Sequence, residues 1–405
     1  MTSRERVLAA LEHREPDRVP IDLSGHRSSG IAAIAYAKLR EYLGLPAKPV
    51  RVYDVIQQLA IVDEDVLDRF KVDTIELGRG FAQDENSWTP WTLPDGTACF
   101  VPAWTNIERD GNRWVIRSGD GRVLAQMPDG TLYFEQTYYP LLEGSDDPQT
   151  IADTLGNCMW TAIAAPPGPV DDAALAAGAR RLRENTNKAI IGLFGGNLFE
   201  IGNFLYRNDQ FMMILAGEPK RAHRFLDKLV EIHLAKLGKF LAAVGEHIDI
   251  ILFGDDLGMQ TGPIMSPAMY REFFKPRHEV LWSRAKELAD VKVMLHCCGG
   301  VRELLGDLIE AGIDAINPVQ INCAGMDAAK LKAEFGRDLT FWGGGCDTGN
   351  MLPNGAPQEI AEHVKEQIRI LKGGGGFVFQ QVHNILANVP PENISAMFDA
   401  ANDAR

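Results

Sequence analysis

The sequence lacks the features that mark membrane proteins, secreted proteins and nucleic-acid-binding proteins. Among its 405 residues no apolar run is long enough to span a bilayer, and the charged opening, Met1 to Arg6, precedes no apolar signal segment. Basic residues are in deficit, since 41 Lys and Arg face 55 Asp and Glu, a net charge of −14. An acidic chain repels phosphate backbones and anionic lipids. We therefore expect a soluble, cytoplasmic protein that binds neither nucleic acid nor membranes.

Cysteine is also scarce, and its distribution excludes a disulfide framework. The six cysteines are dispersed, and only Cys297 and Cys298 are adjacent. This pattern indicates a reducing compartment with thiols free for chemistry. Internal repeats, low-complexity tracts and long linkers are absent as well. We therefore expect one domain over residues 1–405, long enough to bury a large core.

From about residue 185 the chain alternates between strand and helix patterns. The strands are continuous apolar runs, which is typical of parallel strands covered on both faces. With two earlier strands they number eight, which predicts an α/β fold, a (β/α)8 TIM barrel. An open doubly wound sheet is the alternative, but the first strand is followed by no glycine-rich phosphate turn. The expected strands are Arg18–Leu23, Val72–Leu77, Ala189–Phe194, Ile248–Gly254, Val291–Leu295, Ile313–Pro318, Leu339–Gly344 and Gly376–Val382. The main expected helices are Ser3–His13, Gly30–Tyr42, Tyr53–Phe70, Pro219–Val244, Pro267–Leu288, Val301–Gly312 and Pro357–Leu371.

Residues 82–145 have a different character. Asp-Gly pairs recur there between short alternating segments, and four of the seven tryptophans fall in this stretch. Asp-Gly favours the tight turns of antiparallel hairpins. We expect an inserted antiparallel β-hairpin subdomain that flanks or caps the barrel. Its aromatic residues fit a small core of its own better than a lid over the site.

Polar residues follow four of the expected barrel strands, where catalytic groups of such barrels lie. His296 and Cys298 are two residues apart at one strand end, so both side chains point the same way and can reach one metal ion. Imidazole and thiolate are preferred zinc ligands, and a catalytic zinc has three protein ligands and an open position. His383 and Cys346 are the candidates for the third ligand. The alternative is a buried thiol beside a hydrogen-bonded imidazole, which is how we interpret Cys297.

Two further strand ends are candidate parts of the site. Asp255 and Asp256 follow one strand and provide either a general acid or base or a helix N-cap, with Asp255 the expected site residue. Gly195 and Asn197 lie where another strand meets a helix. The glycine there allows a ligand to approach the backbone closely, or serves only a tight turn.

At these residues the sequence resembles the uroporphyrinogen decarboxylase superfamily, in its methyltransferase-like branch. The resemblance covers most of the chain. The matching motifs are Arg4 to Leu11 with Pro16 to Pro20, Gly254 to Gln260 with Ser266, Pro267, Tyr270 and Lys275 to Arg277, His296 to Gly299, Gly343 to Thr348, and His383-Asn384 running to Val389 to Asn393.

The resemblance implies zinc held by His296, Cys298 and a later residue, and a corrinoid (cobalamin) carried by a partner protein. In the family the later ligand is a cysteine ten residues before the Asn of a Pro-x-Glu-Asn segment. Counted from Asn393, that position holds His383, with Cys346 as the substitute. The resemblance also implies catalytic roles for Asp255, Asp347 and His383. It implies substrate contacts for Gly195, Asn197, Gln260, Tyr270 and Asn384.

The expected function is therefore a zinc-dependent methyltransferase that exchanges a methyl group between a thiol or methoxy compound and a corrinoid protein. A metal-independent decarboxylase or lyase is one alternative. True decarboxylases carry an arginine-rich motif where this chain has Ser24 to Ile31, and an aspartate where it has Leu77 to Gly80. A non-catalytic binding protein on the same scaffold is the other alternative. The sequence leaves open whether the protein forms a homodimer.

Overall fold

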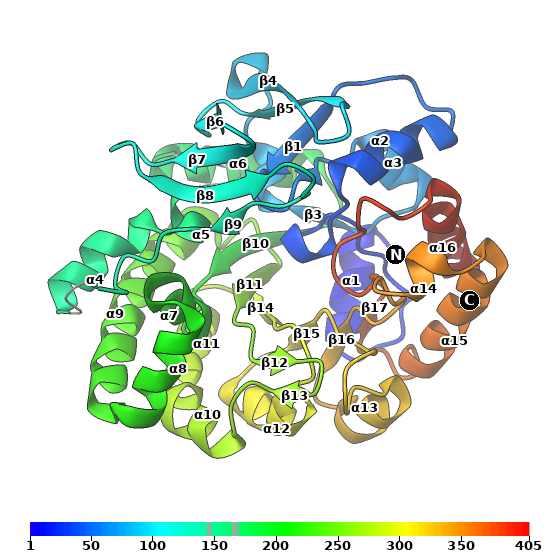
Figure 1. The fold of residues 1–405 in the computed structure, drawn as a ribbon. Coiled ribbons are helices and arrows are strands. Elements are labelled where there is room, and N and C mark those ends of the chain that lie inside the picture. Colours follow the sequence, from blue (N-terminus) through cyan, green and yellow to red (C-terminus); the bar gives the residue numbers. More distant parts are fainter. Residues whose placement is uncertain (144–146, 164–167, 169, 405) are drawn as a thin grey trace.

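The centre of the molecule is a seven-stranded parallel sheet that curls into a barrel (Figure 1). The computed structural model describes residues 1–143, 147–163, 168 and 170–404. In spatial order the strands are β17 (Phe377–Val378), β16 (Thr340–Trp342), β15 (Ala315–Asn317), β14 (Lys292–His296), β11 (Ile250–Gly254), β10 (Ala189–Gly195) and β3 (Thr74–Glu76). Their burial is nearly complete, which explains why the sequence shows apolar runs and no alternation.

A short segment around Ile21 closes the barrel between its two edges. Ile21 forms a parallel bridge with Phe379, and the backbone N–H of Asp73 donates to the Ile21 carbonyl at 2.8 Å. Phe379 follows β17 and Asp73 precedes β3, so this segment occupies the place of the eighth strand. The expected strand over Arg18–Leu23 is thus reduced to a single bridge position. Pro20 shortens it because proline has no N–H to donate to a ladder.

Helices cover the outside of the barrel, and the 26-residue helix α9 shows why they form. Its buried residues recur every three or four positions, so one face packs inward. Proline at the first turn starts the helix, where its missing N–H costs nothing. Among the described residues no helix is long and apolar enough to cross a membrane. The helices are α1 (Ser3–Leu11), α2 (Ala33–Tyr42), α3 (Glu64–Arg69), α4 (Pro148–Thr154), α5 (Met159–Ala162), α6 (Asp172–Asn185), α7 (Phe199–Tyr206), α8 (Asn208–Gly217), α9 (Pro219–Val244), α10 (Pro267–Phe273), α11 (Lys275–Leu288), α12 (Arg302–Ala311), α13 (Ala328–Phe335), α14 (Met351–Asn354), α15 (Pro357–Leu371) and α16 (Pro391–Asp403).

Two smaller sheets form a separate layer beside the barrel, drawn in blue to cyan at the top of Figure 1, and their strands pair antiparallel except for β1 and β5, which pair in parallel. One sheet has the order β6-β7-β8-β9, and the other has the order β2-β1-β5-β4. A small hairpin also follows β11. The strands are β1 (Val50–Asp54), β2 (Leu59–Ala60), β4 (Trp88–Thr92), β5 (Ala98–Pro102), β6 (Ile107–Asp110), β7 (Arg113–Arg117), β8 (Val123–Pro128), β9 (Glu135–Gln136), β12 (Gly258–Met259) and β13 (Gly262–Pro263).

One expected helix is wrong, and another is divided. Residues 53–70 begin as the end of β1 and as β2, and only α3 is helical. Asp54 accepts a hydrogen bond from the backbone N–H of Gln57 at 3.0 Å, which forms a turn that hydrophobic periodicity does not reveal. The expected helix over residues 267–288 is divided between α10 and α11, which meet at Phe274.

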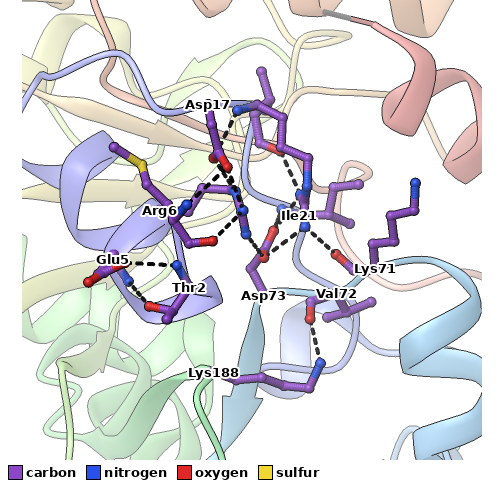
Figure 2. Close-up of polar contacts among 12 residues, drawn as sticks. Thr2, Glu5, Arg6, Asp17, Ile21, Lys71, Val72, Asp73 and Lys188 are labelled. Carbon is purple, nitrogen blue, oxygen red and sulfur yellow. Dashed lines mark hydrogen bonds and ion pairs between the residues drawn. The ribbon is translucent and has the colours of Figure 1, made fainter.

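A network of ion pairs, which we call the ion-pair lock, joins α1, the Ile21 segment and β3 at the N-terminal ends of the barrel strands (Figure 2). Asp73 is fully buried and accepts hydrogen bonds from Arg6 at 2.7 Å, from Arg18 at 2.7 and 2.9 Å, and from the Ile21 backbone at 2.9 Å. Arg6 also donates to Asp17 at 2.7 Å. The opening motif of the chain therefore joins α1, the Ile21 segment and β3, on the side of the barrel away from the strand ends where polar residues gather.

Candidate active site

A cavity of about 530 Å³ opens at the carboxyl ends of the barrel strands. Its polar wall contains residues from several strand ends, as the parallel arrangement predicts. Its other walls are mainly aromatic and aliphatic. The polar and charged residues that line it are Arg27, Ser28, Gln57, Glu76, Asn197, Glu200, His233, Lys236, Asp256, His296 and His383.

His296, Cys298 and His383 form a cluster of metal-ligating side chains beside this cavity. One ligand atom from each residue lies within 4.8 Å of the other two. Cys298 Sγ lies 3.4 Å from His296 Nε2, and the two histidine rings are 5.4 Å apart between centroids. Zinc–nitrogen bonds of about 2.0–2.1 Å and zinc–sulfur bonds of about 2.3 Å at a tetrahedral angle hold N and S roughly 3.5 Å apart. The His296–Cys298 spacing of 3.4 Å fits that geometry.

A hydrogen-bond network fixes which nitrogen of His296 faces the cluster. Asn317 donates both amide hydrogens to oxygens, one to the Trp342 carbonyl at 3.0 Å and one to Gln380 Oε1 at 2.8 Å. Its Oδ1 therefore faces His296 Nδ1 at 2.8 Å and accepts its proton. The Nε2 lone pair of His296 is thus directed toward Cys298 Sγ, as a metal ligand requires.

The protonation of the three side chains suits a cation. Burial, together with the nearby His296 and His26, lowers the pKa of His383 to about 3. Burial also lowers the pKa of His296, although Asp256 opposes that effect. Both imidazoles are therefore neutral near pH 7, with lone pairs free. Burial and then the Asp256 carboxylate raise the pKa of the Cys298 thiol, an effect that a bound cation reverses.

The donor set fits zinc on these observations. Two neutral imidazoles and one thiol converge, and three protein ligands with an open side are the pattern of catalytic zinc sites. His383 adopts φ 62°, a conformation uncommon for residues other than glycine. Backbone strain of this kind is found where the fold holds a functional side chain in place.

Asp256, and not Asp255, faces the cavity. Asp255 is fully buried and accepts hydrogen bonds from the backbone N–H groups of Leu198, Phe199 and Glu200 at 2.9 to 3.2 Å, so it caps the start of α7. Asp256 accepts from the backbone N–H of Cys298 at 2.8 Å, and its Oδ1 lies 3.6 Å from His296 Nε2. Adjacent residues of an extended segment point to opposite sides, so only one of the two aspartates can face the cavity. Of the two roles expected for Asp255, acid–base group or helix cap, the structure shows the helix cap.

Cys346 and Asp347 lie apart from the three-residue cluster. Cys346 is fully buried, and its thiol donates to the Asp347 carbonyl at a sulfur–oxygen distance of 3.9 Å. Asp347 accepts hydrogen bonds from the backbone N–H groups of Gly349, Asn350 and Met351 at 2.9 to 3.3 Å and thus caps α14. The structure therefore brings His383, and not Cys346, to the expected metal pair. Neither Cys346 nor Asp347 lines the cavity.

The five expected substrate contacts separate into two groups. Gly195 and Asn197 line the cavity, and Gly195 has φ 83°, which requires glycine. The other three residues do not line it. Gln260 is exposed in the β12–β13 turn, Tyr270 is buried with its hydroxyl 3.2 Å from His278 Nδ1, and Asn384 accepts from the Gly30 backbone at 2.8 Å.

Four charged residues of the cavity wall were not anticipated from sequence. Glu76 and Glu200 are largely buried, Arg27 lies 3.5 Å from Asp54, and Lys236 comes from the middle of α9. Burial raises the pKa of Glu76 to about 7, against the opposing attraction of Arg27. Burial and then Asp256 raise the pKa of Glu200. Glu200 follows a strand end by a few residues, so the sequence could have identified it as a site residue. Lys236 lies within a long helix, and nothing in the sequence marks it as a site residue.

A family model matches the part of the chain that contains the strand-end site. Residues 171–404, more than half of the chain, match the family model described as uroporphyrinogen decarboxylase (URO-D). The chain belongs to the uroporphyrinogen decarboxylase family. The matched residues include His296, Cys298 and His383.

Individual relatives show partial similarity. The chain is 31% identical over 154 residues to a methylated-thiol–coenzyme M methyltransferase of Methanosarcina mazei, over 37% of each chain. It is 26% identical over 191 residues to a uroporphyrinogen decarboxylase of a Synechocystis species, over 46% of this chain and 49% of the relative. The matches thus span between a third and a half of these relatives. A solved methyltransferase structure from Methanosarcina mazei superimposes with a TM-score of 0.58 at 17% identity, covering 100% of this chain and 99% of the other, which shows a shared fold.

Proposed function

We propose that this protein is a zinc-dependent methyltransferase that exchanges a methyl group between a thiol or methoxy compound and a corrinoid carried by a partner protein. The observation that carries the proposal is the convergence of His296, Cys298 and His383 beside a large cavity. Similarity to the methylated-thiol–coenzyme M methyltransferase supports the reaction type. The corrinoid partner rests on the family resemblance, and we expect it to dock over the strand ends, where the cavity opens.

The residues around the cluster have distinct proposed roles. His296, Cys298 and His383 would hold zinc, which when bound lowers the pKa of a thiol substrate or polarises a methoxy oxygen. Asn317 orients His296 through the 2.8 Å hydrogen bond to Nδ1. Asp256 holds the Cys298 backbone and places a carboxylate 3.6 Å from His296 Nε2, where it stabilises positive charge.

The electron pairs of the broken and formed bonds are accounted for in both directions of methyl transfer. When a methoxy compound or thioether donates, its oxygen or sulfur keeps the electron pair of the broken bond to the methyl carbon. The reduced corrinoid supplies the pair for the new bond. When a thiol accepts, its deprotonated sulfur supplies the pair instead and the corrinoid leaves reduced. Buried acids of the cavity wall, such as Glu76 and Glu200, can then give or take the proton.

Metal analysis and a methyl-transfer assay test the proposal together. Purified protein should contain about one zinc per chain, and it should transfer methyl groups to or from a free or protein-bound corrinoid. Cys298→Ala should abolish both zinc binding and transfer. Cys297→Ala is the matched control, because Cys297 is buried outside the three-residue cluster, and its thiol accepts a hydrogen bond from the Leu257 backbone N–H at 3.3 Å.

Two results would contradict the proposal. Full transfer activity in zinc-free protein would exclude the metal role. Absence of both zinc binding and transfer in folded wild-type protein would favour the metal-independent decarboxylase or the binding protein. Carbon dioxide release from a carboxylated substrate then separates those two alternatives.

A further inference from the structure

One side of the cavity is an aromatic wall that the metal site does not use. Phe194 packs against Phe240 at 5.8 Å and against Phe253 at 5.4 Å between ring centroids. Trp160 and Phe204 form a second pair at 6.0 Å. Of these five, only Phe253 is fully buried, and the other four are partly exposed. The rings lie on β10, β11, α9, α5 and α7, so the wall is assembled by the tertiary structure.

The cavity is much larger than a one-carbon substrate needs. A volume of about 530 Å³ falls in the range that encloses ligands of drug size, roughly 300–1,000 Å³. Methanol or methanethiol would leave most of the aromatic wall facing water. A planar ring instead stacks on such residues, and this contact is favourable beyond the burial of apolar area.

The hydrogen-bonding groups near this wall are already occupied within the protein. His233 Nε2 lies 3.0 Å from the Asn197 carbonyl, and the Asn197 side-chain amide donates to Glu200 at 2.5 Å. These internal hydrogen bonds leave few polar groups on that side that can bind a substrate. The wall therefore selects mainly by shape and aromatic contact.

Lys236 supplies the remaining recognition element. It lies on the cavity face of α9, three residues after His233 and four before Phe240. Lys236 lines the cavity but is also exposed to solvent, and its partial burial lowers its pKa; within the described part of the chain, no carboxylate lies within ion-pair distance of it. The other cation of the wall, Arg27, already lies 3.5 Å from Asp54. Since burial favours the neutral forms of Glu76 and Glu200, the cavity repels an anion less than its composition suggests.

We infer that the small-molecule substrate is an aromatic acid, with its methyl group on a ring oxygen or sulfur. Its ring lies on the wall formed by Phe194, Phe204, Phe240 and Trp160, its ionised acid group pairs with Lys236, and its methyl-bearing atom faces the His296–Cys298–His383 cluster. The inference rests on the proposed function and makes it more specific, because it excludes one-carbon alcohols and thiols as the preferred substrates.

Equilibrium binding of small probes tests this inference without corrinoid or partner protein. Isothermal titration calorimetry of the full-length protein compares 4-methoxybenzoate with its neutral analogue 4-methoxybenzamide, and with methanol and methanethiol. We expect 4-methoxybenzoate to bind at least about tenfold more tightly than the amide. Lys236→Met should remove that difference and leave binding of the amide unchanged. Phe194→Ala should weaken both aromatic probes.

Lys239→Met is the matched control, because Lys239 is exposed on the same helix like Lys236 but, unlike Lys236, does not line the cavity. This variant should retain the preference for the acid. The inference is overturned if the acid and the amide bind equally to wild type, if Lys236→Met keeps the preference, or if only methanethiol or methanol binds. Zinc content and corrinoid methylation are measured separately, so failure here leaves the methyltransferase proposal standing on its own test.

Discussion

Asn317 and His296 are linked by a hydrogen bond of 2.8 Å that determines the tautomer of a candidate metal ligand. The two residues end neighbouring strands, β15 and β14, and are paired in register across the sheet. Gln380 extends the network, because its Oε1 accepts from Asn317 and lies 3.2 Å from His26 Nε2, while its amide donates to the Ser28 carbonyl at 2.9 Å. The orientation of the metal-facing imidazole is thus imposed by neighbouring strand ends.

Replacing Asn317 should therefore change metal affinity. Asn317→Leu removes the acceptor for Nδ1–H, and we expect zinc affinity to fall by about 10–100-fold, the usual cost of losing such a partner. Asn317→Asp keeps an acceptor and should retain zinc affinity within a few-fold, although both variants lose the donors to Trp342 and Gln380. Competition with a chelator measures the affinity. Equal losses in both variants would indicate a role in folding alone.

The third ligand can be assigned by two alanine substitutions. His383→Ala should lower zinc affinity by more than about 100-fold, beyond the cost of an outer contact, because it removes a direct ligand. Cys346→Ala should leave zinc affinity unchanged, since the buried thiol contacts the Asp347 carbonyl and not the cluster. Cobalt(II) substitution gives a second readout through the absorption bands of the bound ion. Loss of zinc in Cys346→Ala with retention in His383→Ala would reverse the assignment.

The ion-pair lock at the other end of the barrel should govern stability and not metal binding. Asp73→Ala leaves Arg6, whose side chain is 8% exposed, without its buried partner. We expect the free energy of unfolding to fall by about 3–5 kcal/mol, as for other broken buried pairs. Asp17→Ala is the control, because Asp17 is 45% exposed and such pairs contribute about 1 kcal/mol or less. Urea unfolding measures both, and a smaller loss for Asp73→Ala than for Asp17→Ala would refute the role of the lock.

Glu76 should make stability depend on pH. Its pKa is about 7 in the folded protein and 4.5 ordinarily, so between these values the unfolded chain releases a proton that the folded chain keeps. Stability is therefore expected to fall as pH rises from about 4.5 to 7, and then to stay level with respect to this group. Glu76→Gln should stabilise the protein at pH 8 by about 3 kcal/mol, at about 1.4 kcal/mol for each pH unit between the two values. The two proteins should be equally stable near pH 4. An equal difference at both pH values would show that Glu76 does not titrate in this range.

The sequence by itself determined the elements of the barrel and one part of the site. Apolar runs located the strands, and the bounds of α9 and α15 agree with the expected helices because periodicity and a starting proline are local signals. The His296-x-Cys298 pair was also predictable, since residues two apart on an extended chain share a side.

The tertiary structure alone decided which strand ends meet at the cluster and what each neighbouring carboxylate does. His383 and Cys346 were both candidates by sequence, with His383 at the position that the resemblance implies and Cys346 as the substitute, and their places depend on how two separate loops turn. Asp255 caps α7 while Asp256 faces the cavity, a choice made by a helix that starts more than fifty residues earlier in the chain. The aromatic wall and Lys236 come from five elements and carry no local signal. The segment around Ile21 bridges the two edges of the sheet, and a closed barrel brings strand ends that are distant in sequence to one end of the molecule, where the cavity lies.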